Sequence, residues 1–494
     1  MLNQILGTLV VTGAGLCLLA AYRAQRIDRP RRALLFIVAA GFLFRTYMGT
    51  DLSLHSWDER YHAVVAKHLM QHPLVPTLYD TPALPYDYRN WLANHIWLHK
   101  PPMALWAAAG SMAVFGVNEI ALRLPSLVLS TLAVVLTYQI GVWLFGTPVA
   151  LVAALFHSVN GVLIELAAGT KASDHVDTLF IVLIELGMAL AFAWSRRPRR
   201  GAPLLIGLVV GLAVLTKWWA AILVVPVLVL LGYRRRSLLS LAAATAVVLL
   251  AVAGVVGPWL TYIHAAFPRE AAWEASYTLR HVIEPIEGQP SSPWYYVVQM
   301  PRFWGELLYL PLGWFLIRVI RGRASREEQA LALWFLVPFV VFTIAVSKMP
   351  GYMMIAAAPV FLIQASFWHR LSQWRSHGWT EGVRRLLLVL LLVLPFRYCF
   401  EVMHPFRTGE RNPSWARALR ALDGQLPDRA VLFGVDHEIE AMFSTRYTAY
   451  PFLPSAAELA IVRNKGRDVA VCAERALPPQ LVADPRVAKV ACGQ

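Results

Sequence analysis

Charge is scarce in this 494-residue chain: Lys, Arg, Asp and Glu together make up 15% of it, whereas 57% of the residues are hydrophobic. So few charges cannot cover the surface of an ordinary soluble enzyme, and a mean hydropathy of +0.52 requires much of that surface to lie in lipid. The composition therefore predicts a polytopic α-helical membrane protein.

Acidic residues are the scarcer charge, with 30 Asp and Glu against 45 Lys and Arg, which gives a net charge of +15. The basic residues stand in short runs between apolar segments. This distribution is typical of cytoplasmic loops under the positive-inside rule and not of a nucleic-acid-binding patch. We therefore expect no nucleic-acid partner.

Cysteine is also rare. The four cysteines, Cys17, Cys399, Cys472 and Cys492, have no CxxC or metal-ligand spacing, so the sequence supports neither a zinc site nor a redox motif. Cys472 and Cys492 both lie in the polar C-terminal region. They can form a disulfide there if that region is extracytoplasmic.

Residues 2–21 lack the charged leading region and the small-residue cleavage site of a signal peptide, and a run of arginines follows them. We expect a retained helix that ends in the cytoplasm and a second span at 33–49 that returns across the membrane. Later segments, including 148–167, 238–257 and 303–320, bring the expected total to about 12 spans. Basic runs at 196–200, 234–236, 318–326 and 370–385 then share the cytoplasmic side.

Two regions follow from this topology. Residues 1–400 form the transmembrane domain, in which 50–122 is the first extracytoplasmic loop, with surface helices at Asp58–Met70 and Met103–Phe115. A second extracytoplasmic loop is expected at 258–302. Residues 401–494 form a small soluble α/β domain, with short strands at 429–435, 447–452, 468–472 and 487–491 and helices near 414–422 and 455–465.

Polar residues of chemical interest gather on the extracytoplasmic side. The acidic pair Asp58-Glu59 lies where an apolar segment gives way to a polar, aromatic loop. A carboxylate there can serve as a general base, although an Asp at a helix start is also typical of an N-cap. Lys100 ends the same loop and can be a snorkelling interfacial lysine, whereas Lys217 interrupts a long apolar stretch, as functional intramembrane charges do.

The order of these motifs resembles the polyprenyl-phosphate-sugar-dependent glycosyltransferases of the GT-C fold, the group of protein O-mannosyltransferases and lipid A aminoarabinose transferases. The matching segments are Asp58-Glu59, His99-Lys100-Pro101-Pro102, Phe115-Gly116-Val117-Asn118-Glu119, Arg123-Leu124-Pro125-Ser126, Asp177 at the start of a span, Leu215-Thr216-Lys217-Trp218 and Ser347-Lys348-Met349-Pro350-Gly351-Tyr352. The resemblance implies a GT-C catalytic domain over 1–400 in a bacterial inner membrane. It also implies an extracytoplasmic active site that moves a sugar, with inversion, from a polyprenyl-phosphate donor to a lipid, glycan or protein acceptor.

The resemblance makes Asp58 the catalytic base and Lys100 the leading phosphate ligand, and Glu59 would position the base or the acceptor. The remaining predicted substrate-binding residues are His99, Asp174, Asp177, Lys217, Lys348, Tyr352 and Arg60. One of Lys217 and Lys348 can instead be an interfacial anchor. Paired carboxylates and the histidines of 55–99 could also form a metal-binding site. The resemblance, however, implies catalysis without a metal or other cofactor.

The sequence departs from the family's pattern at two positions. Arg60 follows Glu59 directly, without the intervening residue that many members have, so on a helix it points about 100° away from the expected direction. His99 stands where the lipid A branch often has Glu, which weakens an assignment to aminoarabinose transfer.

Two other classes compete with the enzyme. A transporter or flippase of lipid-linked glycans would also need a cationic cavity, but it favours broken helices in repeated halves, and the sequence has no such symmetry. A structural scaffold does not explain why Asp58, Lys100, Asp177, Lys217 and Lys348 share one side. No motif names the sugar or the acceptor.

Overall fold

The computed structural model describes residues 2–172, 174–375, 377–474 and 476–493, so Ser173, next to the predicted Asp174, lies outside it. The chain forms two compact units, each assembled from separate segments. Unit 1 comprises Met1–Gly49, Ser126–Ala266 and Ala275–Thr408, and unit 2 comprises Thr50–Pro125, Phe267–Glu274 and Gly409–Gln494. The division at residue 401 stays a prediction.

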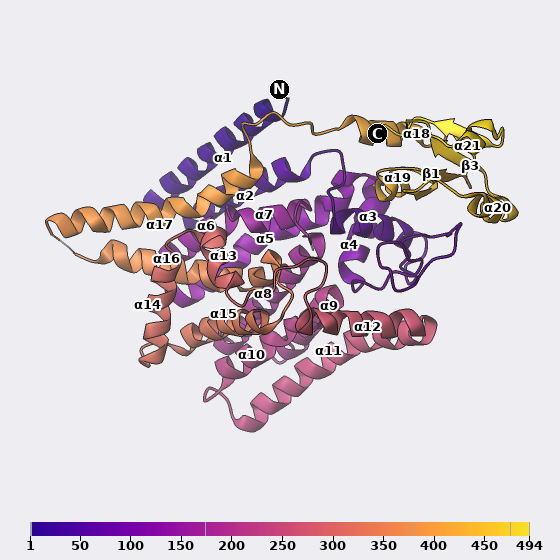
Figure 1. The fold of residues 1–494 in the computed structure, drawn as a ribbon. Helices are drawn as coiled ribbons and strands as arrows, with labels where there is room; N and C mark the ends of the chain where they lie inside the picture. The colour runs from indigo at the N-terminus through magenta and orange to yellow at the C-terminus, as the bar shows by residue number, and fades with distance from the viewer. Residues whose placement is uncertain (1, 173, 376, 475, 494) are drawn as a thin grey trace. The chain divides into compact units, whose positions relative to one another are not determined.

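Unit 1 is built from helices (Figure 1). They are α1 (Leu2–Arg26), α2 (Pro30–Gly49), α6 (Thr147–Ser158), α7 (Gly161–Ala168), α8 (Asp174–Arg196), α9 (Ala202–Lys217), η1 (Trp218–Leu223), α10 (Val224–Gly232), α11 (Leu238–Ala266), α13 (Tyr295–Trp304), α14 (Tyr309–Ile320), α15 (Arg326–Ile344), η2 (Pro350–Ala356), α16 (Ala357–Gln373) and α17 (Trp379–Met403). Two more helices, α5 (Glu119–Phe145) and α12 (Pro268–Ile283), contain unit boundaries.

The spanning helices confirm a polytopic membrane protein. In the described part of the chain, 8 helices are long and apolar enough to cross a membrane, or up to 10 if each of two bent pairs is one span. Three shorter apolar helices, Met103–Phe115, Ala202–Lys217 and Trp219–Gly232, fall below the roughly 20 residues that a straight span needs. The expected total of about 12 spans is therefore not confirmed.

Three of the expected spans have wrong boundaries. The span expected at 148–167 is two helices bent by 50°, because Asn160 caps α7 by accepting from the Leu163 N–H. The span expected at 303–320 begins at Tyr309, after a 112° bend at Gly305, whose φ is 97°. The span expected at 238–257 continues to Ala266, and α12 occupies much of the loop expected at 258–302.

Unit 2 combines the first polar loop with the C-terminal region. Its elements are α3 (Asp58–Leu69), α4 (Met103–Phe115), α18 (Ser414–Leu422), β1 (Val431–Phe433), α19 (Glu438–Ser444), β2 (Thr448–Tyr450), α20 (Ala456–Asn464), β3 (Val469–Cys472), α21 (Pro479–Ala483) and β4 (Val487–Val490). The four expected strands and the C-terminal helices near 414–422 and 455–465 are confirmed. The four strands form a parallel sheet of order β2-β1-β3-β4, and helices make the crossovers that parallel pairing requires.

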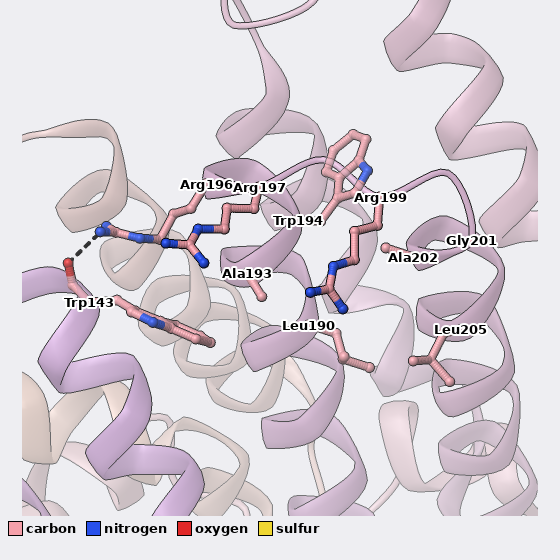
Figure 2. A pocket seen from close by; sticks show the side chains of 10 residues that line it. All are labelled: Trp143, Leu190, Ala193, Trp194, Arg196, Arg197, Arg199, Gly201, Ala202 and Leu205. Carbon is pink, nitrogen blue, oxygen red and sulfur yellow. Dashed lines mark hydrogen bonds between the residues drawn. The ribbon is translucent and has the colours of Figure 1, made fainter.

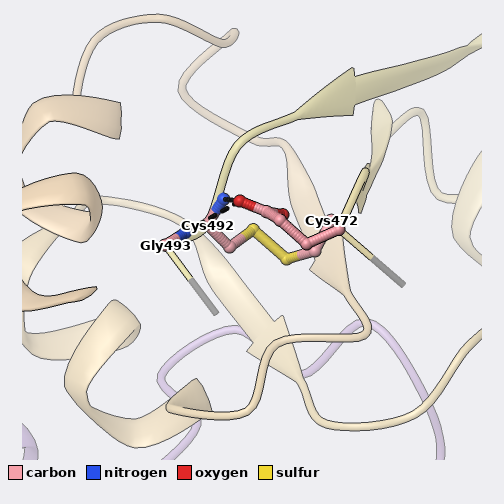
Figure 3. The surroundings of a disulfide bond; sticks show 4 residues. Cys472, Cys492 and Gly493 are labelled. Atoms are coloured by element: carbon pink, nitrogen blue, oxygen red, sulfur yellow. Dashed lines mark hydrogen bonds between the residues drawn. A yellow bond between two sulfur atoms is a disulfide. The ribbon is translucent and has the colours of Figure 1, made fainter. Parts of the chain in front are cut away.

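A disulfide between Cys472 and Cys492 joins the end of β3 to the residues after β4 (Figure 3). The Cα atoms are 5.5 Å apart, within the usual range for the bond. The Glu474 carboxylate accepts from the N–H groups of Cys492 and Gly493 at 2.8 and 2.9 Å. The sequence left open whether these two cysteines pair, and the structure shows that they do.

Helix α3 is packed and does not lie open on a bilayer surface. The expected helix is confirmed, but 8 of its 12 residues are buried, because α4 and α19 both cover it. The Lys67 ammonium donates to the carbonyls of Met442, Phe443 and Thr445 at 2.8, 3.0 and 2.6 Å. These are the last carbonyls of α19, so Lys67 caps that helix and ties it to α3.

Candidate functional site

Asp58 is the first residue of α3, and its neighbour Trp57 is the N-cap. Trp57 makes no side-chain capping bond and has a φ of 72°, a left-handed conformation that is uncommon for a large side chain. The Lys100 ammonium lies 3.8 Å from Asp58 Oδ2, and both side chains are mostly buried. Unit 2 therefore brings together the predicted base and the predicted leading phosphate ligand.

Glu59 faces a different partner. Its carboxylate is fully buried and accepts two hydrogen bonds from Arg123, at 2.6 Å from Nε and 2.9 Å from Nη2. Arg123 also donates to Asp51 Oδ1 at 2.6 Å. This bidentate pair fixes the first turn of α3 to α5. The role of Glu59 in positioning the base or the acceptor stays a prediction.

His55 completes this network. Its ring nitrogens lie 2.7 Å from Glu59 Oε2 and 2.9 Å from Asp51 Oδ2. Burial alone lowers the pKa of His55, but the two carboxylates outweigh burial and the nearby Arg123 charge and raise it to about 9. The imidazole is therefore a cation at neutral pH that holds both carboxylates.

His99 lies beside Lys100 in an aromatic and acidic setting. Its Nδ1 is 3.3 Å from Glu274 Oε2, and the Trp91 ring stacks on it with centroids 4.4 Å apart. Burial, and then the Lys100 charge, lower the pKa of His99. His99 is therefore neutral at neutral pH.

Arg60 is directed toward α19. Its guanidinium lies 3.7 Å from Glu440 Oε1 and 5.0 Å from the Tyr61 ring centroid. The ion pair with Glu440 ties the first turn of α3 to α19. No substrate contact of Arg60 is tested by these interactions, so its role in substrate binding stays a prediction.

Unit 1 brings together a second group of predicted residues. Asp177, in the first turn of α8, is buried and accepts a short hydrogen bond from the Lys217 ammonium at the end of α9. The same ammonium lies 4.8 Å from the Tyr352 ring centroid, a cation–π contact. Gly351 leaves room for this group, because a Cβ there would lie 2.6 Å from Asp177 Oδ2.

Asp174 and Lys348 are two further predicted residues of unit 1. Asp174 is buried at the start of α8, where its Oδ1 accepts from the Val176 N–H at 3.4 Å. The Lys348 ammonium is buried and donates to the carbonyl of Ala345, and burial lowers its pKa. This lysine thus braces its own turn.

Among the described residues, no group of three or more His, Cys, Asp or Glu side chains is placed to hold a metal ion. The sequence placed Arg123 in a matching segment without giving it a role, and it did not point to Glu274 or Trp91 as members of the site. Arg123 carried a usable signal, because an arginine in an apolar helix needs an acidic partner. Glu274 carried none, since 175 residues separate it from His99.

Comparison with known proteins places this geometry in context. Residues 99–262 match the family model described as dolichyl-phosphate-mannose-protein mannosyltransferase. An undecaprenyl phosphate-α-4-amino-4-deoxy-L-arabinose arabinosyl transferase from Pseudomonas aeruginosa is 30% identical over 332 residues, 63% of this chain and 58% of that protein. A relative of the same description from Pseudomonas fluorescens is 30% identical over 56% of this chain and 49% of that protein. The chain thus spans less than two thirds of these relatives.

Solved structures show the same fold. ArnT from Cupriavidus metallidurans, bound to undecaprenyl phosphate, superposes with a TM-score of 0.63 at 17% identity and covers 92% of this chain and 89% of its own. The archaeal oligosaccharyltransferase AglB from Archaeoglobus fulgidus, in complex with an inhibitory peptide and a dolichol-phosphate, has a TM-score of 0.57 at 14% identity, covering 85% and 64%. The chain therefore has the GT-C fold and resembles the polyprenyl-phosphate-sugar-dependent glycosyltransferases.

Proposed function

We propose that this protein is a glycosyltransferase that moves a sugar from a polyprenyl-phosphate donor to an acceptor at the extracytoplasmic face of a bacterial inner membrane. The observation that carries the proposal is the contact between Asp58 and Lys100, a carboxylate and an ammonium 3.8 Å apart in a chain with the GT-C fold. Sugar transfer from a lipid phosphate needs these two groups, a base and a cation.

The reaction is a displacement at the anomeric carbon. The acceptor hydroxyl forms a bond to that carbon while the carbon–oxygen bond to the phosphate breaks, and the electron pair leaves on the polyprenyl phosphate. Asp58 takes the hydroxyl proton. Lys100 stabilises the negative charge that grows on the leaving phosphate.

The other lysines divide between two roles. Lys217 is the candidate phosphate ligand of unit 1, because its ammonium lies beside Asp177 and Tyr352 at the end of a helix. Lys348 is mainly structural, since it already donates to the carbonyl of Ala345. Asp177 and Tyr352 orient Lys217 before the donor arrives, which lowers the entropic cost of binding.

Charge and redox chemistry support the proposed side of the membrane. The disulfide Cys472–Cys492 lies in unit 2, as do Asp58 and Lys100. Disulfides persist in oxidising compartments such as the bacterial periplasm. The basic run at 196–200 stands at the far end of α8 from Asp177, as positive-inside topology requires.

The relatives suggest the first donor to test. Their names describe undecaprenyl phosphate carrying 4-amino-4-deoxy-L-arabinose, so undecaprenyl phosphate is the proposed carrier and an aminopentose the first sugar. Lipid, glycan and peptide acceptors follow in that order, because the arabinosyl transferases are the relatives found in sequence and the peptide-bound AglB is similar in fold only.

The test is transfer in vitro with the purified full chain, undecaprenyl-phosphate-linked sugar and envelope lipid as acceptor. We expect Asp58→Asn to lower kcat by roughly 100- to 10,000-fold, the usual contribution of general base catalysis. Asp87→Asn is the matched control, because Asp87 is an exposed carboxylate of the same loop that pairs with Arg89. Unchanged transfer by Asp58→Asn would refute the mechanism, and movement of the donor across proteoliposomes without transfer would favour a flippase.

A further inference from the structure

A cationic and aromatic cavity of about 760 Å³ lies in unit 1, at the far end of α8 from Asp177. From Asp177 to Arg196 the helix rises roughly 28 Å, so this cavity is separate from the group of Asp177, Lys217 and Tyr352. The ten residues that line it are Trp143, Leu190, Ala193, Trp194, Arg196, Arg197, Arg199, Gly201, Ala202 and Leu205.

Three arginines face this cavity, and none of the ten described lining residues is acidic. Arg196 donates to the carbonyl of Trp143 at 3.0 Å, which fixes it to the end of α5. The guanidinium groups of Arg197 and Arg199 point into the gap above Ala193 and Leu190 (Figure 2). In the described part of the chain, neither of these two side chains makes a hydrogen bond or ion pair.

Contacts outside the cavity fix the position of Trp194, one of the residues that line it. Trp194 is buried, and the Arg236 guanidinium stacks on its ring at 3.8 Å while donating to its carbonyl at 3.0 Å. One wall is therefore held in place by contacts that do not use Arg197 or Arg199. Gathered like charges without a counter-charge favour an anion with several oxygen atoms, which guanidinium groups bind in pairs.

The position of the cavity indicates that the anion is a lipid headgroup and not a soluble anion. It lies where α5, α8 and α9 end or begin, and α5 and α8 are long enough to span a membrane. Arginine beside tryptophan at the end of a span is typical of the membrane–water interface, where phospholipid phosphates lie. Leu190 and Leu205 line the same cavity and suit the apolar part of a lipid.

We propose that this cavity binds the phosphate headgroup of an anionic phospholipid of the surrounding bilayer, with Arg197 and Arg199 as the phosphate ligands and Arg196 and Trp143 as the wall. The site takes a lipid other than the sugar donor. It anchors the end of α8 whose other end carries Asp177.

The experiment measures binding of phosphatidylglycerol to the purified full chain by native mass spectrometry, with phosphatidylcholine as the zwitterionic reference. The variant R197Q/R199Q removes both free guanidinium groups and is expected to fold, because both side chains are exposed. We expect its apparent Kd for phosphatidylglycerol to rise roughly 10- to 30-fold, since each basic residue near an anionic headgroup contributes a factor of about 5.

The matched control is R31Q/R32Q, which removes the same charge from exposed arginines at the start of α2. We expect its Kd to stay within roughly twofold of the unmodified protein. An equal loss of binding in both variants, or none in R197Q/R199Q, would overturn the proposal. Displacement of the lipid by an equal concentration of pyrophosphate would overturn it as well and assign the site to a soluble anion.

Discussion

Asp177 and Lys217 show how a buried charge pair can prepare a binding group. Asp177 is 2% exposed, and a carboxylate at that depth is stable only with partners such as the Lys217 ammonium. The pair holds Lys217 near Tyr352, where it is available as a proposed phosphate ligand. The loss of stability on replacing either residue depends on whether the other one is left buried with its charge unpaired.

Lys217→Met is expected to destabilise the protein by roughly 3–5 kcal/mol, because it leaves the Asp177 carboxylate buried without its lysine. Asp177→Asn/Lys217→Met is expected to recover a large part of that loss. Thermal unfolding of the four proteins of this cycle in one detergent measures the coupling. A double variant that loses the sum of the two single effects would show that the pair is not coupled.

Gly351 is expected to affect transfer activity through the position of the Asp177 carboxylate. Gly351→Ala places a Cβ 2.6 Å from Asp177 Oδ2, so the carboxylate must move away from its position beside Lys217. We expect transfer activity to fall roughly tenfold, the usual order of effect for a residue that orients a binding group without contacting the substrate. Gly254→Ala is the matched control, since a Cβ there meets nothing within 4 Å. Equal activities would remove Gly351 from the site.

At the scale of elements, α3 is held at both of its ends. Arg123 of α5 fixes its first turn through Glu59, and Lys67 in its last turn caps α19. The helix itself was predictable from its periodicity and from the acidic pair. Its partners were not, because hydrophobic patterns describe one face of a helix and carry no information on which distant segment covers it.

The His55 network predicts a pH-dependent stability. The unfolded His55 has a pKa near 6.5 and the folded one near 9, so its contribution is fully present below pH 6.5 and is lost as pH rises through 9. A shift of this size is worth about 3 kcal/mol. His55→Gln should therefore be less stable than the unmodified protein at pH 6, and the difference should vanish by about pH 9.5.

Unfolding midpoints of both proteins between pH 6 and 9.5 check this. The comparison removes contributions common to both, such as Lys67, whose pKa burial lowers to about 8. A constant difference across the range would mean that His55 stabilises the network without titrating.

At the scale of the whole molecule, composition was enough to predict a multi-pass helical protein, and local hydrophobic patterns were enough to predict its C-terminal α/β region. The order of motifs was enough to predict the GT-C fold. The bends at Asn160 and Gly305 were not predictable from apolar length, because they arise from one capping side chain and one left-handed glycine. Ion pairs such as Arg123 with Glu59 depend on the folded chain bringing residues together.

The membrane sidedness predicts a labelling pattern. In a Cys17→Ala/Cys399→Ala background, spheroplasts should resist a membrane-impermeant maleimide until mild reduction opens the Cys472–Cys492 bond. Labelling should then follow without permeabilisation. Arg199→Cys in the same background, with Cys472 and Cys492 replaced by Ala, should be labelled only after permeabilisation. Labelling in the reverse order would invert the proposed topology.

Unit 2 is discontinuous, and this has a consequence for its biosynthesis. Lys67 and the Met442 carbonyl that it binds are 375 residues apart. At the ~5–20 residues per second of translation, roughly 20–75 s pass between the synthesis of α3 and that of α19. During this interval the face of α3 that α19 covers lacks its C-terminal partner, so unit 2 can complete its fold only after nearly the whole chain has been synthesised.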